Sequence, residues 1–470
     1  MQKKEQYKRL IMFLLSTVIV ALLTAVFAYV WYTFYADDET ILIKVFWRRG
    51  NYVLIGLYAL MTVLLYKVVG GFKVGYLRIW DALVSQVIAI VCVNAVTYLQ
   101  LCLIGHWKFL QHLTPIWGMT AVDLVLVVLW SFFSRGIYLK VYPPKKLLLV
   151  GEGYNVDMLL SKLATRGDKY IVQETISHLD PPETIKGRID SYQSVILGDI
   201  PSSARNELLK YCFSRDIRCY SVPKITDILI RSATDIDLFD TTLLLFRNIG
   251  LSVESQFLKR LFDIVASALG LVLISPLMLC IAVCIKLYDG GPVFFTQDRL
   301  TKGGKVFKIY KFRSMKMAEE QEKYCMTRKN DERITPVGKI IRDFHLDELP
   351  QLLNILKGEM SIVGPRPECP ELAEKYGKSI PEFDFRLKVK AGLTGYAQVY
   401  GQYNTTPYDK LKLDLTYIEN YSFRLDMKLI LLTVKILFYK EKTEGIEEWQ
   451  TAAATREEME EKGNCEDRST

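Results

Sequence analysis

Two adjacent carboxylates, Asp347 and Glu348, stand at the centre of a stretch that also carries cations, RDFHLDELPQLLNILKGEMSIVGPRP (342–367). Arg342 precedes the pair by five residues, and Arg366 lies between two prolines that restrict the backbone on either side of it. An arginine held in this way suits bidentate recognition of a phosphate group. Because Mg²⁺ binds one or two carboxylates together with phosphate oxygens, this combination predicts phosphate chemistry that uses a metal.

A purely structural interpretation also explains the acid pair. Asp347 is a favoured N-cap, Glu348 suits the positive end of a helix dipole, and Pro350 is tolerated in a first turn. Apolar residues then follow at helical spacing, and Gly358 fits a C-cap. We therefore expect a helix that begins at the acid pair, although a helix start alone does not explain the two arginines around it.

Three long segments, in this order, resemble the bacterial polyprenyl-phosphate sugar-1-phosphate transferases, which start capsule, exopolysaccharide and O-antigen repeat units on a lipid carrier. The segments are GGPVFFTQDRLTKGGKVFKIYKFRSM (290–315), LDELPQLLNILKGEMSIVGPRP (346–367) and VKAGLTGYAQVYGQ (389–402). The resemblance covers residues 251–440, and the plan of the preceding residues is similar to that of the large members of the family.

This resemblance implies a reaction and two catalytic residues. A UDP-sugar donates its sugar-1-phosphate to a polyprenyl phosphate, usually undecaprenyl phosphate, and UMP is released. Asp347 is then the nucleophile that forms an aspartyl-phosphosugar intermediate, and Glu348 is the metal ligand that holds Mg²⁺. Neighbouring residues on a helix point in directions about 100° apart, so one carboxylate can face phosphorus while the other faces the metal.

The resemblance also implies a set of residues that bind phosphate or substrate. They are Arg342, Arg366, Lys311, Arg313, Gln297, Arg299, Gly392, Thr394 and Gly395. We expect the arginines and Lys311 to grip the diphosphate or the carrier phosphate, and the glycine-rich loop to approach the nucleotide. That loop has Ala391 where many members have proline. His345, beside the acid pair, is either an acid–base group or a residue that fills a helix start.

The N-terminal third of the chain predicts a membrane domain. Half of all residues are apolar, and four apolar stretches reach the length of a bilayer span. They are Leu10–Tyr35, Tyr52–Val69, Ile79–Ile104 and Ile116–Phe133. Basic residues flank both ends of the set, so the positive-inside rule puts both ends in the cytoplasm of a bacterial cell. Asp123 in the fourth span marks either a polar pathway or a helix–helix or lipid-facing contact.

A fifth apolar run, at 261–287, is long enough to cross a bilayer, but it contains Ser275 and Pro276 near its middle. Proline removes a backbone hydrogen bond, and Ser275 can satisfy the freed carbonyl. Lys259, Arg260 and Lys286 flank both ends, which suits two ends on one face. We therefore expect a re-entrant helix–break–helix that keeps the acid pair on the cytoplasmic face of the inner membrane.

Between the membrane domain and this run, short β-rich segments alternate with helical ones, which predicts a doubly wound parallel sheet. We expect strands at 146–150, 194–200, 216–222 and 241–246. Gly151 and Gly153 form half of a dinucleotide-binding fingerprint, and a tight strand–helix turn explains them better. The role of this Rossmann-like domain is not revealed by the sequence.

The expected fold class is therefore a multidomain membrane protein with a mainly α catalytic part that includes a β-hairpin around 301–304. The expected divisions are a four-helix transmembrane region (1–140), a degenerate Rossmann-like domain (141–250), the catalytic domain (251–440) and a mobile charged tail (441–470). The net charge of +8 suits anionic lipid and nucleotide phosphates better than nucleic acid. The nine cysteines, without a C-x-x-C pair, suggest free thiols. A homo-oligomer remains open.

Two rival functions remain. A membrane-anchored nucleotide-sugar dehydratase or epimerase would need a Tyr-x-x-x-Lys pair on a helix, and Tyr220–Lys224 has that spacing but contains Pro223. A non-catalytic scaffold for polysaccharide assembly would need no carboxylate at Asp347. The sequence does not identify the sugar or the polysaccharide pathway.

Overall fold

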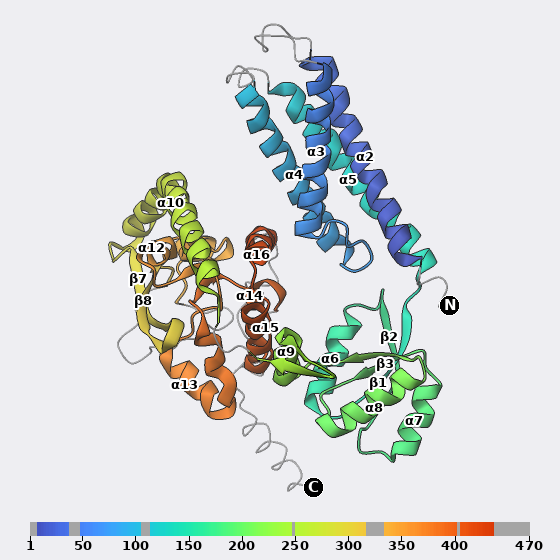
Figure 1. The fold of residues 1–470 in the computed structure, drawn as a ribbon. Coiled ribbons are helices and arrows are strands. Elements are labelled where there is room, and N and C mark those ends of the chain that lie inside the picture. Colours follow the sequence, from blue (N-terminus) through green and yellow to red (C-terminus); the bar gives the residue numbers. More distant parts are fainter. Residues whose placement is uncertain are drawn as a thin grey trace. The chain divides into compact units, whose positions relative to one another are not determined.

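The structure is a computed structural model that describes residues 7–36, 48–104, 113–246, 250–315, 333–401 and 405–436 (Figure 1). The expected tail at 441–470 lies outside these residues. The chain forms two compact units, Met1–Val222 and Pro223–Thr470. The described part is mostly helical with some sheet, and it contains five helices that are long and apolar enough to cross a membrane.

Four of these helices belong to unit 1 and coincide with the four apolar stretches of the sequence. They are α2 (Lys8–Phe34), α3 (Arg48–Val69), α4 (Ile79–Ile104) and α5 (Thr114–Val141). Tyr58 of α3 and Asn94 of α4 both donate hydrogen bonds to the Asp123 carboxylate of α5, over 3.4 and 3.0 Å. Because these bonds join three helices, the contacts of Asp123 favour the helix–helix interpretation over a polar pathway.

The remainder of unit 1 is a four-stranded parallel sheet in the order β2-β1-β3-β4. The strands are β1 (Lys145–Val150), β2 (Tyr170–Ile176), β3 (Ser194–Leu197) and β4 (Arg218–Ser221), and the helices are α6 (Tyr154–Ala164), α7 (Pro182–Asp190) and α8 (Ser202–Ser214). Alternate residues of β1 pack on opposite sides: Leu148 lies with the α7 and α8 side chains, whereas Leu149 lies with Val156 of α6. Helices therefore cover both faces of the sheet, as expected for parallel strands.

The expectation of a strand at 241–246 in this sheet is wrong. β6 (Thr241–Leu245) pairs antiparallel with β5 (Thr234–Leu238) in a separate hairpin of unit 2. α9 (Ile225–Ser232) precedes that hairpin and packs on α15 (Pro407–Glu419), where Ser232 Oγ donates to Glu419 over 3.0 Å. A run of apolar residues does not reveal which strand it will pair with, because pairing depends on contacts distant in sequence.

Unit 2 is built around α10 (Val253–Asp289), a helix of 37 residues. The other elements, in chain order, are β7 (Phe294–Leu300), η2 (Lys302–Gly304), β8 (Val306–Phe312), α11 (Pro336–Asp343), η3 (Leu346–Glu348), α12 (Gln351–Lys357), β9 (Ser361–Val363), α13 (Pro370–Ser379), η4 (Pro381–Lys388), β10 (Gly392–Thr394), α14 (Tyr396–Tyr400), α15 and α16 (Phe423–Ile436). β7 and β8 form the expected hairpin around 301–304.

The interruption expected at Ser275 and Pro276 is a bend inside α10 and does not divide the segment into two helices (Figure 1). Ser275 Oγ donates to the carbonyl of Val272 over 2.8 Å, which is the carbonyl that Pro276 leaves without its helical donor. Ile274 before the bend packs with Phe307 and Leu352, and Ile281 after it packs with Phe312 and Ile341. Both arms of α10 therefore contact the rest of unit 2.

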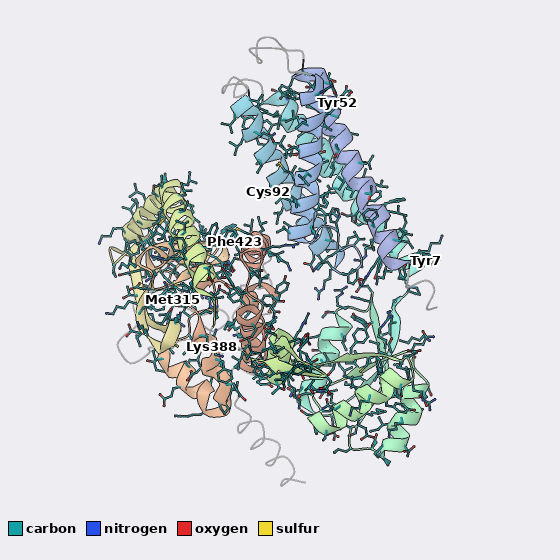
Figure 2. The ribbon with its side chains drawn as sticks, in the orientation of Figure 1. Tyr7, Tyr52, Cys92, Met315, Lys388 and Phe423 are labelled. Carbon is teal, nitrogen blue, oxygen red and sulfur yellow. The ribbon has the colours of Figure 1, made fainter. Side chains whose placement is uncertain are left out.

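The first arm of α10 is attached to unit 2 by buried polar contacts. Lys259 Nζ lies 2.6 Å from Asp426 Oδ2 of α16 and 3.1 Å from the hydroxyl of Tyr417, which donates to the other oxygen of Asp426 over 2.8 Å. Asp263 accepts hydrogen bonds from the Ser361 hydroxyl and the Ile362 amide of β9. Phe423, labelled in Figure 2, stacks edge-on against Phe262 with ring centroids 5.5 Å apart.

The cysteines depart from the expectation in one place. The cysteines at positions 92, 102, 212, 219, 280 and 284 are free thiols, as expected. Cys369, however, is disulfide-bonded, and its partner lies outside the described residues. The sequence did not indicate this bond, because no short spacing pairs Cys369 with another cysteine.

The Lys259–Asp426 contact leads to a stability prediction. Lys259→Met should destabilise the protein by about 3–5 kcal/mol, because it leaves the Asp426 carboxylate buried without its cation. The double variant Lys259→Met/Asp426→Asn should recover part of this loss. Thermal unfolding of the full chain in detergent measures both, with Lys378→Met as the control, since Lys378 forms only an exposed pair with Glu374. A single variant as stable as the control would contradict the prediction.

Candidate active site

The acid pair lies in η3, a single 3₁₀ turn between α11 and α12. The expectation that Asp347 caps the following helix is wrong, because α12 begins at Gln351 and its N-cap, Pro350, has no side-chain hydrogen bond. The chain enters the turn through His345, which adopts a left-handed conformation (φ 56°) that is uncommon for a residue with a Cβ atom. The expected end of the helix is confirmed: Gly358 is left-handed and its amide bonds to the carbonyls of Asn354 and Ile355.

Glu348 is held between two cations that come from other segments. Its Oε1 lies 3.2 Å from Lys311 Nζ at the end of β8 and 2.9 Å from Nη2 of Arg366. Burial disfavours the charged carboxylate, but Arg366 and Lys311 outweigh it and hold the pKa of the Glu348 carboxyl well below its usual range. Glu348 therefore stays ionised, as a metal ligand must.

Asp347 is in the opposite electrostatic situation. Burial raises the pKa of its carboxyl, and the neighbouring charge of Glu348 adds to this, whereas Lys311 and Arg342 oppose it. Arg342, in the last turn of α11, thus acts on Asp347 through its charge. The two carboxylates differ in environment although they are adjacent, and such a difference lets adjacent acids take separate roles.

A divalent cation fits this acid pair by the chemistry of its donors. Carboxylate oxygens are the ligands that Mg²⁺ prefers, and one or two of them suffice when phosphate oxygens and waters complete the shell. The described residues contain no cluster of three or more His, Cys, Asp or Glu side chains that could hold an ion by itself. Asp347 and Glu348 are therefore suited to a metal that arrives with a phosphate.

Arg366 reaches Glu348 from a short segment, Gly364–Pro367, that the strands β9 and β10 hold in place. The Gly364 amide donates to the Thr394 carbonyl and the Gly392 amide donates to the Pro365 carbonyl, each over 2.8 Å. A Cβ atom on Gly395 would lie 2.1 Å from the Gly364 carbonyl oxygen, so the two backbones touch directly.

Three of the residues expected to approach the nucleotide support the Gly364–Pro367 segment through these backbone contacts. Gly392, Thr394 and Gly395 are buried behind the Gly364–Pro367 segment. The hydroxyl of Thr394 is hydrogen-bonded to that of Thr433 in α16, 2.5 Å away.

Two further predicted residues, Gln297 and Arg299 of β7, also meet this segment. Nη1 of Arg299 donates to the Pro367 carbonyl over 3.2 Å, and its Nη2 donates to Gln297 Oε1 over 2.7 Å. Arg313 is buried against Gly291, on which a Cβ atom would lie 2.3 Å from its Nη1. The contacts that the structure shows at the acid pair come from Lys311 and Arg366, and Arg342 acts on Asp347 through its charge. Ser275 and Pro276 lie at the bend of α10.

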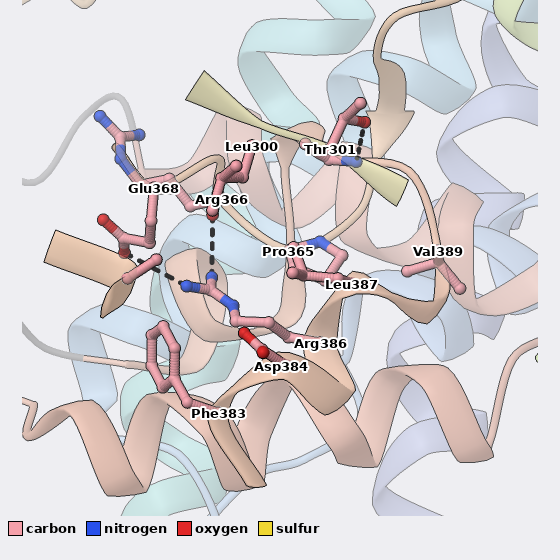
Figure 3. Close-up of a pocket in the computed structure, with 12 residues that line it drawn as sticks. Leu300, Thr301, Pro365, Arg366, Glu368, Phe383, Asp384, Arg386, Leu387 and Val389 are labelled. Carbon is pink, nitrogen blue, oxygen red and sulfur yellow. Dashed lines mark hydrogen bonds and ion pairs between the residues drawn. The ribbon is translucent and has the colours of Figure 1, made fainter. Parts of the chain in front are cut away.

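Sequence reasoning missed a second charged cluster behind Arg366. Nη2 of Arg386, in η4, donates to the Arg366 carbonyl, and its guanidinium is paired with Glu368 and with Asp414 of α15. Figure 3 shows Arg386 between Glu368 and the main chain of Arg366, beside a small hollow that Phe383 and Val389 also line. Arg386 stands in a stretch where charged and apolar residues alternate, PEFDFRLK (381–388), so the sequence did not indicate which of the charged residues is buried.

The glycine turn of unit 1 has the geometry of close packing. A Cβ atom on Gly151 would lie 2.8 Å from the Val156 side chain, and one on Gly198 would lie 3.3 Å from it. Asn155 Nδ2, in the first turn of α6, donates to the Asp199 carboxylate over 3.0 Å. The tight-turn interpretation is therefore favoured for Gly151, whereas Gly153 has open space around it and a left-handed backbone (φ 83°).

The backbone contacts around Gly364 lead to a prediction about stability. Gly395→Ala should lower the stability by about 1–3 kcal/mol, because the new methyl group overlaps the Gly364 carbonyl oxygen. The matched control is Gly377→Ala in α13, where nothing lies within 4 Å of the added atom, and it should leave stability unchanged or raise it by up to about 1 kcal/mol. Thermal unfolding compares the two; equal melting temperatures would disprove the contact.

Comparisons with known proteins concern this half of the chain. The family described as "Bacterial sugar transferase" matches residues 254–440. A UDP-N-acetylgalactosamine-undecaprenyl-phosphate N-acetylgalactosaminephosphotransferase of Aeromonas hydrophila is 36% identical over 262 residues, 55% of this chain and 61% of the relative. A UDP-glucose:undecaprenyl-phosphate glucose-1-phosphate transferase of Klebsiella pneumoniae is 46% identical over 181 residues, 37% of this chain and 39% of the relative.

A third relative is covered more fully. The UDP-glucose:undecaprenyl-phosphate glucose-1-phosphate transferase of Caulobacter vibrioides is 41% identical over 184 residues, which are 38% of this chain and 69% of the relative. The matches to the first two relatives span less than two thirds of the length of those proteins.

Proposed function

This chain belongs to the bacterial sugar transferases, and from that premise we propose that it transfers the sugar-1-phosphate of a UDP-sugar to undecaprenyl phosphate and releases UMP. The observation that carries the proposal is the acid pair Asp347–Glu348, set between Lys311, Arg342 and Arg366. The product would be the first lipid-linked intermediate of an extracellular polysaccharide such as a capsule. The relatives are named for different sugars, N-acetylgalactosamine and glucose, so the family does not identify the sugar.

The proposed mechanism has two displacements. In the first, a carboxylate oxygen of Asp347 attacks the phosphorus that bears the sugar, and the bond from that phosphorus to the bridging oxygen breaks, so UMP leaves with the electron pair. In the second, an oxygen of undecaprenyl phosphate attacks the same phosphorus and expels the Asp347 carboxylate. No net proton transfer is needed, which suits a site whose side chains are mainly carboxylates and cations.

Each neighbouring residue then has a defined task. Lys311 and Arg342 oppose protonation of Asp347, which must be ionised to attack. Arg366 would bind the diphosphate oxygens through its exposed guanidinium, which already contacts Glu348. Mg²⁺, when held by Glu348 and the substrate, would neutralise charge on the phosphates, and in its absence the low pKa of Glu348 keeps that ligand deprotonated.

The alternative of a nucleotide-sugar dehydratase or epimerase loses support. Tyr220 lies in β4 of unit 1, whereas Lys224 is the N-cap of α9 in unit 2, so the two residues do not share a helix. Asn155, which follows the glycine turn at 151–153, also binds the carboxylate of Asp199. A scaffold without catalysis remains as the second candidate, and it predicts no activity that depends on Asp347.

The direct test is UMP release by the purified full chain in nanodiscs, with undecaprenyl phosphate, Mg²⁺ and a panel of UDP-sugars. The proposal expects UMP to appear with at least one sugar only when undecaprenyl phosphate is present. A scaffold would release UMP with none of them. The sugar that supports the highest kcat/KM then names the substrate.

The acid pair provides the sharpest mutational prediction. Asp347→Asn should abolish UMP release and Glu348→Gln should reduce it steeply, because the first removes the nucleophile and the second removes the proposed metal ligand. The matched control is Asp343→Asn, which changes an exposed carboxylate at the end of α11, four residues before Asp347. Near-wild-type turnover in Asp347→Asn would exclude the covalent intermediate, whatever its effect on stability.

We also propose the arrangement of the protein at the membrane. The bend of α10, the contacts of both of its arms with unit 2 and the large apolar side chains it exposes fit a helix that enters the inner leaflet and returns. Leu273 and Leu279, on either side of the bend, are 78% and 67% exposed. The acid pair would then lie at headgroup level on the cytoplasmic face, where the carrier phosphate and UDP-sugar both have access.

This arrangement predicts a labelling result. A cysteine placed at Lys302, which is exposed, should be protected in intact cells from a membrane-impermeant thiol reagent and should react once the cells are opened. The native cysteines are removed first, and a cysteine at a periplasm-exposed reporter position serves as the positive control. Labelling from outside would mean that α10 spans the membrane, as its length allows.

A further inference from the structure

Arg386 is a buried guanidinium with three polar partners, and it also lies over the ring of Phe383, 5.1 Å from the ring centroid. Its side chain is 5% exposed. Nη2 lies 2.8 Å from the carbonyl oxygen of Arg366 and 2.9 Å from Asp414 Oδ2, and Nη1 lies 3.4 Å from Glu368 Oε1. Figure 3 shows the bonds to Arg366 and Glu368 leaving the guanidinium in two directions.

Such a cluster is costly to bury, so its position requires an explanation. Burial raises the pKa of the Asp414 carboxyl to about 6, and Arg386 opposes that shift. Glu368 is surrounded by more cations: burial disfavours its charge, but Arg386, Lys410 and Arg299 hold the pKa of its carboxyl below the usual range. Apolar side chains of similar volume would cost less free energy to bury, but they could not donate a hydrogen bond to a main-chain carbonyl.

The carbonyl that Arg386 binds belongs to the residue that reaches the acid pair. The side chain of Arg366 contacts Glu348, and its carbonyl accepts from Arg386. Pro365 and Pro367 fix φ on both sides of Arg366, so the orientation of its carbonyl largely decides where its side chain starts. Arg299 fixes the next carbonyl, that of Pro367, in the same way.

We infer that Arg386 is a positioning residue for Arg366: by binding the Arg366 carbonyl, while Glu368 and Asp414 hold its own guanidinium, it aims the Arg366 side chain at Glu348 and the substrate phosphates. This rests on the proposed function, since it assigns Arg386 a part in that same site. Arg386 does not touch the reacting atoms. A lysine could not replace it, because Arg386 presents two nitrogens, Nη1 and Nη2, to its three partners, whereas a lysine has a single ammonium group.

The test is a double-mutant cycle on UMP release with Arg366→Lys, Arg386→Lys and the double variant. Misplacing a catalytic group by about 1 Å can slow turnover on the order of 100-fold, and we expect Arg386→Lys to lower kcat by about 10- to 100-fold. If Arg386 acts through Arg366, the double variant is no slower than Arg366→Lys alone. Losses that multiply would overturn the inference, because they would mean that Arg386 acts independently of Arg366.

Two measurements keep the test decisive if a variant folds poorly. Asp414→Asn, which removes one holder of the guanidinium and keeps the volume, should give a smaller loss with the same dependence on Arg366. Arg205→Lys is the control, because Arg205 is similarly buried but lies in unit 1 and should not affect the rate. An Asp414→Asn loss that persists unchanged in an Arg366→Lys background would contradict the inference.

Hydrogen–deuterium exchange separates this inference from the proposed function. The peptide 361–369 should take up deuterium faster in Arg386→Lys than in wild type, since the segment loses its buried bond, and Arg205→Lys should leave it unchanged. If the wild-type protein releases no UMP with any UDP-sugar, the proposed function fails. The exchange result then decides by itself whether Arg386 holds the segment around Arg366 in place. Unchanged exchange in Arg386→Lys would overturn the inference.

Discussion

The contact of Glu348 with Lys311 and Arg366 is the interaction on which the catalytic half depends. It joins the end of the β7–β8 hairpin, the 3₁₀ turn of the acid pair and the segment after β9, which are far apart in sequence. The two cations keep Glu348 ionised despite its burial, while Asp347 beside it is pushed toward its neutral form. One small cluster therefore both assembles the site and gives its two acids different properties.

The apolar helix α10 connects this cluster to the membrane. Its outward face is apolar, whereas Lys259 and Asp263 on the inward face bind α16 and β9 through buried polar contacts. β9 leads directly to Gly364 and Arg366, so α10 is joined through one short strand to the segment that carries Arg366. Polar contacts suit this attachment. If the inner face of α10 were purely apolar, like its outer face, the helix could rotate about its axis without a preferred orientation.

The backbone around Arg366 shows how an exposed cation can be held precisely without many side-chain contacts of its own. Prolines limit the main-chain angles around it, and the glycines near β10 allow direct contact of two backbones. The guanidinium group of Arg386 binds its own carbonyl, and that of Arg299 binds the carbonyl of Pro367. The side chain itself remains accessible to a substrate. Rigidity is supplied from behind the site, where water does not weaken the hydrogen bonds.

The sequence alone determined the membrane helices, the β-hairpin, the end of α12 and the members of the acid–cation cluster, because hydropathy, turn residues and long motifs are local properties of the chain. Tertiary structure decided the rest. It placed Asp347 in a 3₁₀ turn and not at the start of α12, moved the strand at 241–246 out of the parallel sheet, and put Gly392 and Thr394 behind Arg366. It alone revealed Arg386, because the burial of a charge depends on partners such as Asp414 that lie close only after folding.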